Sequence, residues 1–124
     1  MKLPKGHQTI MPYLILKEAE KFSDFAKNVF GAKVIMNRLR EDEKTIMHSE
    51  ISIGDSTLMF AGATEQWKPQ TANLFIYVTN ADEAYKKAIR AGATTVMELT
   101  DQDYGRTCGV IDPFGNTWWI TAIN

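Results

Sequence analysis

The sequence lacks the features that mark secreted, membrane-spanning and nucleic-acid-binding proteins. It has one cysteine, Cys108, which excludes an intrachain disulfide and a zinc-finger cluster, so we expect a cytoplasmic protein. The apolar run at residues 10–16 is far shorter than the roughly 20 residues that cross a bilayer, and no signal-peptide cleavage pattern follows it. With 14 basic and 15 acidic side chains, no charge excess favours nucleic acid or a membrane as the partner.

The chain does have enough apolar sequence for one folded domain. Of its 124 residues, 44% are hydrophobic and 23% are charged, which excludes a disordered protein. A chain of this size buries roughly two-thirds of its unfolded surface, so its core needs no metal or disulfide.

Hydrophobic periodicity predicts a strand, a helix and three strands, in that order, twice. The first set has strands at 11–16, 33–38, 45–53 and 57–61 and a helix at about 18–30 that ends at Gly31. The second has strands at 73–78, 94–98, 107–111 and 117–123 and a helix that begins after Asn80 and ends at Gly92. The sequence around Gly31 also repeats around Gly92. We therefore expect two βαβββ modules, at about 8–62 and 72–124, joined by a connection that contains Trp67.

A tight turn at Gly54-Asp55 predicts which face each hairpin residue occupies. A two-residue turn places Glu50 opposite Met59, on one face of the sheet, and Ile51 opposite Leu58 on the other. The face under the helix is expected to hold Met47, Ile51, Ile53, Leu58 and Phe60, and the opposite face His48, Glu50, Ser52 and Met59. His48 and Glu50 would then form an acid/base pair or contact a ligand. In the alternative, Glu50 is a solvated strand residue or is bonded to a neighbouring hydroxyl.

Three local patterns resemble one known family. They are Asp112-Pro113-Phe114-Gly115-Asn116 with Trp118-Trp119-Ile120, the segment Asp101-Gln102-Asp103-Tyr104-Gly105-Arg106, and Met47-His48-Ser49-Glu50. Together they are similar to the PhnB-like branch of the vicinal oxygen chelate (VOC) superfamily, which includes glyoxalase I, extradiol dioxygenases and bleomycin-resistance proteins. The resemblance runs from about residue 11 to 123. It implies an α+β fold in which two βαβββ modules form curled mixed sheets around a shared cavity, and it implies a homodimer.

The resemblance also implies where metal ligands would lie, on the first and last strand of each module. Those positions hold Met11, Met59, Asn73 and Trp119. Thioether and indole groups do not bind a hard divalent cation. We therefore expect no metal and no other cofactor, and the family's metal-dependent chemistry is not implied.

In the cavity that the resemblance implies, strand alternation places a wall of aromatic, thioether and amide groups, suited to a flat or apolar organic ligand with a few polar anchors. The expected ligand contacts are Met11, Tyr13, His48, Glu50, Met59, Trp67, Asn73, Phe75, Tyr77, Tyr104, Arg106 and Trp119. Arg106 would either hold an anionic group or form a surface pair with an aspartate. His7, near the terminus, is expected to face solvent, and Cys108 to lie in the core.

Three functions remain open. The first is a metal-free protein that sequesters or carries an aromatic or amphipathic metabolite or antibiotic. The second is a VOC-type enzyme, a lyase, isomerase or dioxygenase-like protein that uses Glu50 and His48 with or without an unorthodox divalent metal. The third is a dimeric interaction module with a collapsed cavity, since a fold alone does not determine function.

Overall fold

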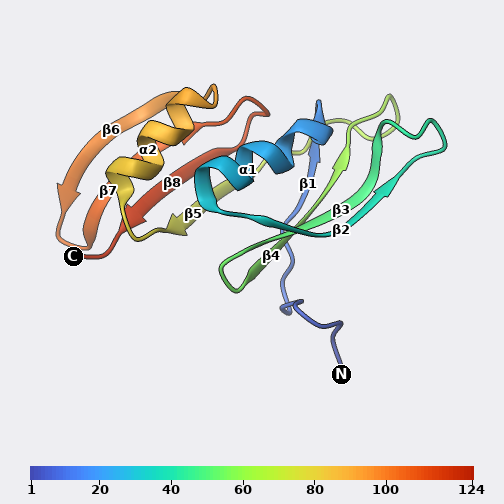
Figure 1. Cartoon of the computed structure of the whole chain (residues 1–124), viewed down its shortest axis with the longest axis horizontal. Helices are drawn as coiled ribbons and strands as arrows, with labels where there is room; N and C mark the ends of the chain where they lie inside the picture. Colours follow the sequence, from blue (N-terminus) through green and yellow to red (C-terminus); the bar gives the residue numbers. More distant parts are fainter.

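The computed structural model describes residues 1–124 as two four-stranded sheets that lie side by side (Figure 1). Sheet 1 consists of β1 (Tyr13–Leu16), β2 (Lys33–Leu39), β3 (Ile46–Ile53) and β4 (Ser56–Gly62). Sheet 2 consists of β5 (Asn73–Tyr77), β6 (Thr94–Gln102), β7 (Gly105–Ile111) and β8 (Thr117–Ala122). Between the first two strands of each sheet the chain forms a helix: α1 (Phe22–Phe30), after a 3-10 turn (Ala19–Lys21), and α2 (Ala81–Arg90).

The two sheets have the same topology. Their strand orders are β1-β4-β3-β2 and β5-β8-β7-β6, and in each the first strand pairs in parallel with the last while the other pairs are antiparallel. Each sheet also has a register shift at the same place, between Val34 and Met36 and between Thr95 and Met97. This is the predicted α+β fold, with the βαβββ order repeated.

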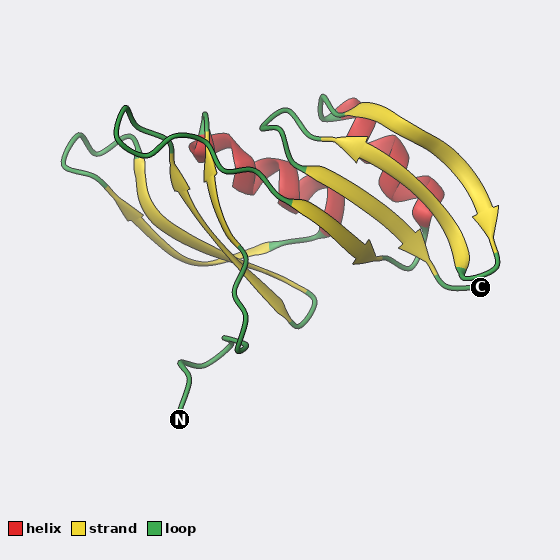
Figure 2. Ribbon diagram, turned by 180° about the vertical axis from the view of Figure 1, so that it is seen from behind, coloured by secondary structure: helices red, strands yellow, loops and turns green.

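The helix ends follow the predicted signals. Gly31 caps α1 at φ 70°, a left-handed conformation that favours glycine. The Asn80 side chain accepts a hydrogen bond from the Glu83 backbone N–H at 3.0 Å and so begins α2. Both helices lie on the same side of the molecule, and Figure 2 shows the sheets from the opposite side, with the helices behind them. Each sheet therefore has one face under a helix and one open face.

The core lies on the helix side and joins the two modules through aromatic contacts. Phe114, from the β7–β8 loop, packs edge-on against Phe22 and Phe25 of α1, with ring centroids 5.5 and 6.1 Å apart. Phe30 of α1 packs against Trp118 of β8 at 4.6 Å. The two halves of the chain thus share one hydrophobic cluster instead of folding around separate cores.

The Gly54-Asp55 turn has the predicted register, with Glu50 opposite Met59 and Ile51 opposite Leu58. One residue of the predicted helix-side face is wrong: Met47 is 45% exposed, and Ile46, 4% exposed, occupies the core in its place. The cause is a second register shift, where the pairing of Arg38 with His48 gives way to that of Leu39 with Ile46. A bulge of this kind changes which residues face the core.

The segment Asp101–Arg106 is not a loop between the strands predicted at 94–98 and 107–111. β6 continues to Gln102, which pairs with Gly105, so Asp103 and Tyr104 form a two-residue hairpin turn. No helix is long and apolar enough to cross a membrane.

Candidate functional site

A carboxylate with two imidazole partners occupies the open face of sheet 1. Glu50 accepts hydrogen bonds from His48 Nε2 at 2.9 Å and from His7 Nε2 at 2.7 Å, one on each carboxylate oxygen. His48 and Glu50 lie on the same side of β3, as strand alternation predicts. His7 comes from the segment before β1, which is held to sheet 1 by a bond from the Thr57 hydroxyl to the Gly6 carbonyl and by the Gln8 amide.

Glu50 is 6% exposed, and its carboxylate is stabilised in its charged form. Burial raises its pKa, but the hydrogen bonds and charges of His48 and His7 lower it by more, so the pKa lies below the ordinary glutamate value. Glu50 is therefore an ionised acceptor that orients both imidazoles. The expectation that His7 faces solvent is wrong, because its ring is bound to Glu50.

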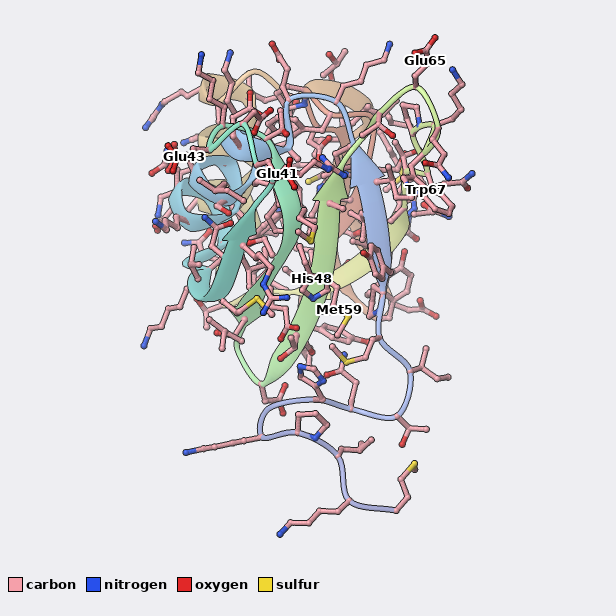
Figure 3. All side chains as sticks on the ribbon, turned by 90° about the vertical axis from the view of Figure 1, so that its right-hand side faces the viewer. Glu41, Glu43, His48, Met59, Glu65 and Trp67 are labelled. Atoms are coloured by element: carbon pink, nitrogen blue, oxygen red, sulfur yellow. The ribbon has the colours of Figure 1, made fainter.

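Predicted ligand contacts surround this group. Tyr13 packs edge-on against the His48 ring, with centroids 5.6 Å apart. Met59 lies between Tyr13 and Glu50 in the strand pairing, and Figure 3 shows Met59 beside His48. Met11 is partly buried just before β1.

Sheet 2 carries an aromatic surface on its open face. Phe75 packs against Tyr77 with centroids 5.3 Å apart and against Tyr104 at 6.4 Å, and about half or more of each side chain is exposed. Next to Phe75, Trp119 donates its indole N–H to the Asn73 side-chain oxygen at 2.7 Å. The indole covers Gly109, where a Cβ atom would overlap the ring.

The four positions where the resemblance places metal ligands do not fit a divalent cation. Met11 and Met59 offer thioethers, Trp119 offers no lone pair, and the Asn73 oxygen accepts the indole hydrogen bond. No group of three or more His, Cys, Asp or Glu side chains is arranged to hold a metal. The nearest such group, around Glu50, directs its imidazoles at the carboxylate instead of at a common point. No chemical step is therefore assigned to a metal.

Arg106 lies away from the other predicted contacts. Its guanidinium donates to Asp82 at the start of α2 at 2.8 Å and to Asp101 at 3.2 Å, and these bonds raise its pKa. This is the surface pair that the sequence left open as an alternative. With two carboxylates already bound, Arg106 has little capacity for an anionic ligand.

Four of the predicted contacts line cavities, and they line two different ones. Tyr13 and Trp67 border a cavity of about 790 Å³ on the open face of sheet 1. Phe75 and Tyr77 border a cleft of about 770 Å³ between the modules, together with Phe30 and Trp118. Tyr13 and Trp67 therefore do not line the same cavity as Phe75 and Tyr77.

The sheet 1 cavity is bounded by the connection between the modules. Trp67 is 57% exposed on that connection, next to β1 (Figure 3). Thr64 and Trp67 are joined by two hydrogen bonds of 2.9 Å, and Gln70 pairs with Ile15 of β1 through two backbone bonds. These contacts hold the connection against the sheet. The cavity wall also includes Met47 and an arginine, Arg40. No sequence pattern marks Arg40 as a site residue, because it lies in a charged hairpin segment.

Comparison with known proteins finds relatives that match most of this chain. An uncharacterized protein of Mycobacterium bovis is 30% identical over 121 residues, which cover 88% of this chain and 79% of the relative. Among solved structures, TioX from Micromonospora sp. ML1 superposes with a TM-score of 0.76 at 21% identity, over 94% of this chain and 99% of TioX.

Two further structures share the fold. The PhnB protein from Bacillus cereus has a TM-score of 0.75 at 15% identity and covers 93% of this chain and 99% of its own. TnmS3, an antibiotic binding protein from Streptomyces sp. CB03234, has a TM-score of 0.71 at 15% identity, with 95% and 100% coverage. The model of the Glyoxalase/Bleomycin resistance protein/Dioxygenase superfamily matches residues 7–120. This chain belongs to that superfamily.

Proposed function

We propose that the protein binds a small aromatic or amphipathic molecule, a metabolite or an antibiotic, and that it needs no metal to do so. The cavity on the open face of sheet 1, with Tyr13, Met47 and Trp67 exposed around it, carries this proposal. Covering such side chains with a flat apolar molecule removes their surface from water, which favours binding. The antibiotic-binding protein TnmS3 has the same fold, which supports the proposal by analogy.

We also propose a homodimer, in which a second copy covers apolar surface that one chain leaves open. β2 is exposed along its whole length although it contains Val34, Ile35, Met36 and Leu39. Exposed apolar edge strands are unusual in proteins that stay monomeric. A second copy would also bring an aromatic sheet 2 surface to the sheet 1 cavity of its partner, and so restore the shared site predicted from the family.

Light scattering of the purified protein tests the dimer. The chain has a mass of 14.0 kDa, so the expected particle has twice that mass at micromolar concentration. A particle of 14.0 kDa at that concentration contradicts the proposal.

Tryptophan fluorescence tests ligand binding. A panel of planar metabolites and antibiotics should include molecules that quench the exposed Trp67, while Trp118 in the core gives a constant background. Trp67→Phe should remove most of the quenching, and Trp119→Phe should remove any part that comes from sheet 2. Calorimetric saturation by a compound that leaves the fluorescence unchanged would place the ligand elsewhere and contradict this site.

The Glu50 group favours a second candidate function, that of an enzyme without a metal. An ionised carboxylate that holds an imidazole can stabilise the imidazolium form, so His48 would accept a proton from a substrate while Glu50 keeps the ring oriented. Turnover of a bound compound that is lost in His48→Gln, with its binding retained, would establish this function. Binding without turnover in the wild type would favour a carrier.

The single thiol gives no support to a redox or nucleophilic role. Cys108 is completely buried in β7, and burial raises its pKa to about 11. A thiol in this state is unreactive, as expected for a core residue. We propose a cytoplasmic location because the chain has no disulfide to adapt it to an oxidising compartment, and cell fractionation tests this.

A further inference from the structure

Arg40 differs from Arg106, the other arginine described above, in having no carboxylate partner. Arg106 is paired with two aspartates, whereas no carboxylate lies within ion-pair distance of Arg40. The only hydrogen bond of the Arg40 side chain joins Nη2 to the Gly62 carbonyl at 3.1 Å. The other terminal nitrogen, Nη1, is shielded from solvent and has no hydrogen-bond partner. A charged donor without a partner costs free energy in the folded protein.

Backbone hydrogen bonds fix the main chain at Arg40, and one side-chain hydrogen bond places its guanidinium at the cavity. Arg40 follows β2, and its N–H donates to the Thr45 carbonyl at 2.8 Å while its own carbonyl accepts from Glu43 N–H at 2.9 Å. The side chain then extends to the end of β4 and forms part of the wall of the cavity that Tyr13, Met47 and Trp67 border. A fixed positive charge therefore lies in a wall that is otherwise largely apolar.

No acidic group around the β2–β3 hairpin forms an ion pair with Arg40. The hydrogen bonds of Lys44 and Thr45 lower the pKa of Asp42, and the charge of Arg40 lowers it by a smaller amount. Asp42 is occupied by hydrogen bonds from Lys44 N–H and from the N–H and hydroxyl of Thr45. Glu65 is the one acidic residue in the cavity wall, and it is exposed on the rim, where its side chain projects away from the rest of the molecule (Figure 3). An exposed rim charge is screened by salt far more than a charge within a wall.

We infer that the ligand of this cavity is an aromatic carboxylic acid: its ring system lies against Trp67 and Tyr13, and its carboxylate pairs with Arg40. A planar carboxylate matches a guanidinium and supplies the countercharge that Arg40 lacks in the folded chain. This inference rests on the proposed binding function and adds to it the charge and chemical class of the ligand.

A pair of probes with the same ring separates the two proposals. Calorimetry measures the affinity of the full-length protein for 2-naphthoate and for 2-naphthalenemethanol, which lacks the charge. We expect the acid to bind at least about tenfold more tightly. Arg40→Met, which keeps the length of the side chain, should abolish this preference while changing the affinity for the alcohol by less than about twofold.

Matched variants control for net charge and for folding. Arg90→Met removes one positive charge at the end of α2, away from the cavity, and should keep the preference for the acid. Arg40→Met should melt within about 2 °C of the wild type, because Arg40 has one hydrogen bond to lose and an unpaired nitrogen to relieve. If Arg40→Met does not fold, Arg40→Lys replaces it in the test. Lysine keeps the charge but lacks the planar guanidinium, so this variant should retain only part of the preference for the acid over the alcohol.

Equal affinity for the two probes, or an Arg40→Met variant that still prefers the acid, would overturn the inference while leaving aromatic binding intact. Failure of both probes to bind contradicts the proposed function as well. A preference for the acid that Arg40→Met removes and Arg90→Met keeps supports both.

Discussion

The two sheets have the same backbone pairing but opposite chemistry at corresponding positions of their open faces. In sheet 1, Tyr13, Met59 and Glu50 lie side by side across β1, β4 and β3. In sheet 2, the same three strand positions hold Phe75, Trp119 and Gly109. One sheet presents a carboxylate with imidazole partners, and the other presents an indole that lies flat over a glycine.

This difference shows that the repeated backbone fold places residues at equivalent positions, while the side chains at those positions determine the chemistry of each open face. Trp119 fits on sheet 2 only because residue 109 has no side chain, and Glu50 is buried on sheet 1 because His7 and His48 satisfy it. The connections differ too. Gly54-Asp55 joins β3 to β4 in two residues, while the β7–β8 loop is longer and is organised by the buried Asp112.

Replacing Asp112 should have the largest effect on stability. Its carboxylate accepts hydrogen bonds from Phe114 N–H, from the N–H and side-chain amide of Asn116 and from the Trp118 indole, at 2.8–2.9 Å. Asp112→Ala leaves these donors unpaired in the core and should lower the free energy of unfolding by about 3–5 kcal/mol. Asp55→Ala, in the exposed turn of sheet 1, should change it by less than about 0.5 kcal/mol in chemical denaturation. Equal effects would mean that the two connections are equally important.

Ile51→Ala tests the assignment of faces within sheet 1. Ile51 is completely buried under α1, so its truncation opens a core cavity and should cost about 3 kcal/mol. Ile35→Ala on the exposed β2 should cost about 0.5 kcal/mol or less in the monomer, and should instead weaken the dimer. Thermal melting measures the stability of each monomer, and light scattering over a dilution series measures the dimer. If the Ile35→Ala monomer is less stable than the Ile51→Ala monomer, the assignment of core face and exposed face is wrong.

Gly109→Ala tests whether the flat indole depends on the missing side chain. The added methyl group overlaps Trp119, which must rotate and give up its bond to Asn73, at a cost of about 1–3 kcal/mol. In a Trp119→Ala background the same change should cost much less, as a double-mutant cycle would show. An unchanged cost in that background would point to backbone strain at Gly109 instead.

Glu50→Gln should have the smallest effect, and that effect should depend on pH. Because the pKa of Glu50 is lower in the folded chain than in the unfolded chain, its contribution is fully present above the ordinary glutamate pKa and is lost as the pH falls through the folded value. At neutral pH the variant should be about 1 kcal/mol less stable than the wild type. Denaturation from neutral pH down to about pH 3 should show the difference shrinking; a constant difference would contradict the ionised role.

The fold could be predicted from the sequence because its signals are local. The Gly54-Asp55 turn determines a register in which every partner is a few residues away, and the Asn80 cap needs only Glu83. The amphipathic patterns then determine which face each helix covers. These signals act within one element or one hairpin, where strand and helix periodicity are reliable.

The site could be predicted only in part, because its decisive contacts are distant in sequence. His7 reaches Glu50 across 43 residues, and no local pattern marks a terminal histidine as a partner. Arg106 meets Asp82 of α2, which a reading of its own segment does not reveal. For Met47, the adjacent apolar pair Ile46-Met47 was a signal that could have indicated a bulge, since only one of two neighbours can face the core of a regular strand.

The aromatic contacts across the modules bear on how the chain folds. Each parallel pair, β1 with β4 and β5 with β8, closes a segment of about 45 residues, so either half can form its sheet without waiting for the other. Phe114 and Trp118, however, complete their packing only against α1 of the first half. When only the first half of the chain has emerged from the ribosome, sheet 1 can form, but α1 still lacks its contacts with Phe114 and Trp118. We expect the chain to fold cooperatively only after β8 has emerged. We also expect two separately expressed halves to recover the native structure when they are mixed.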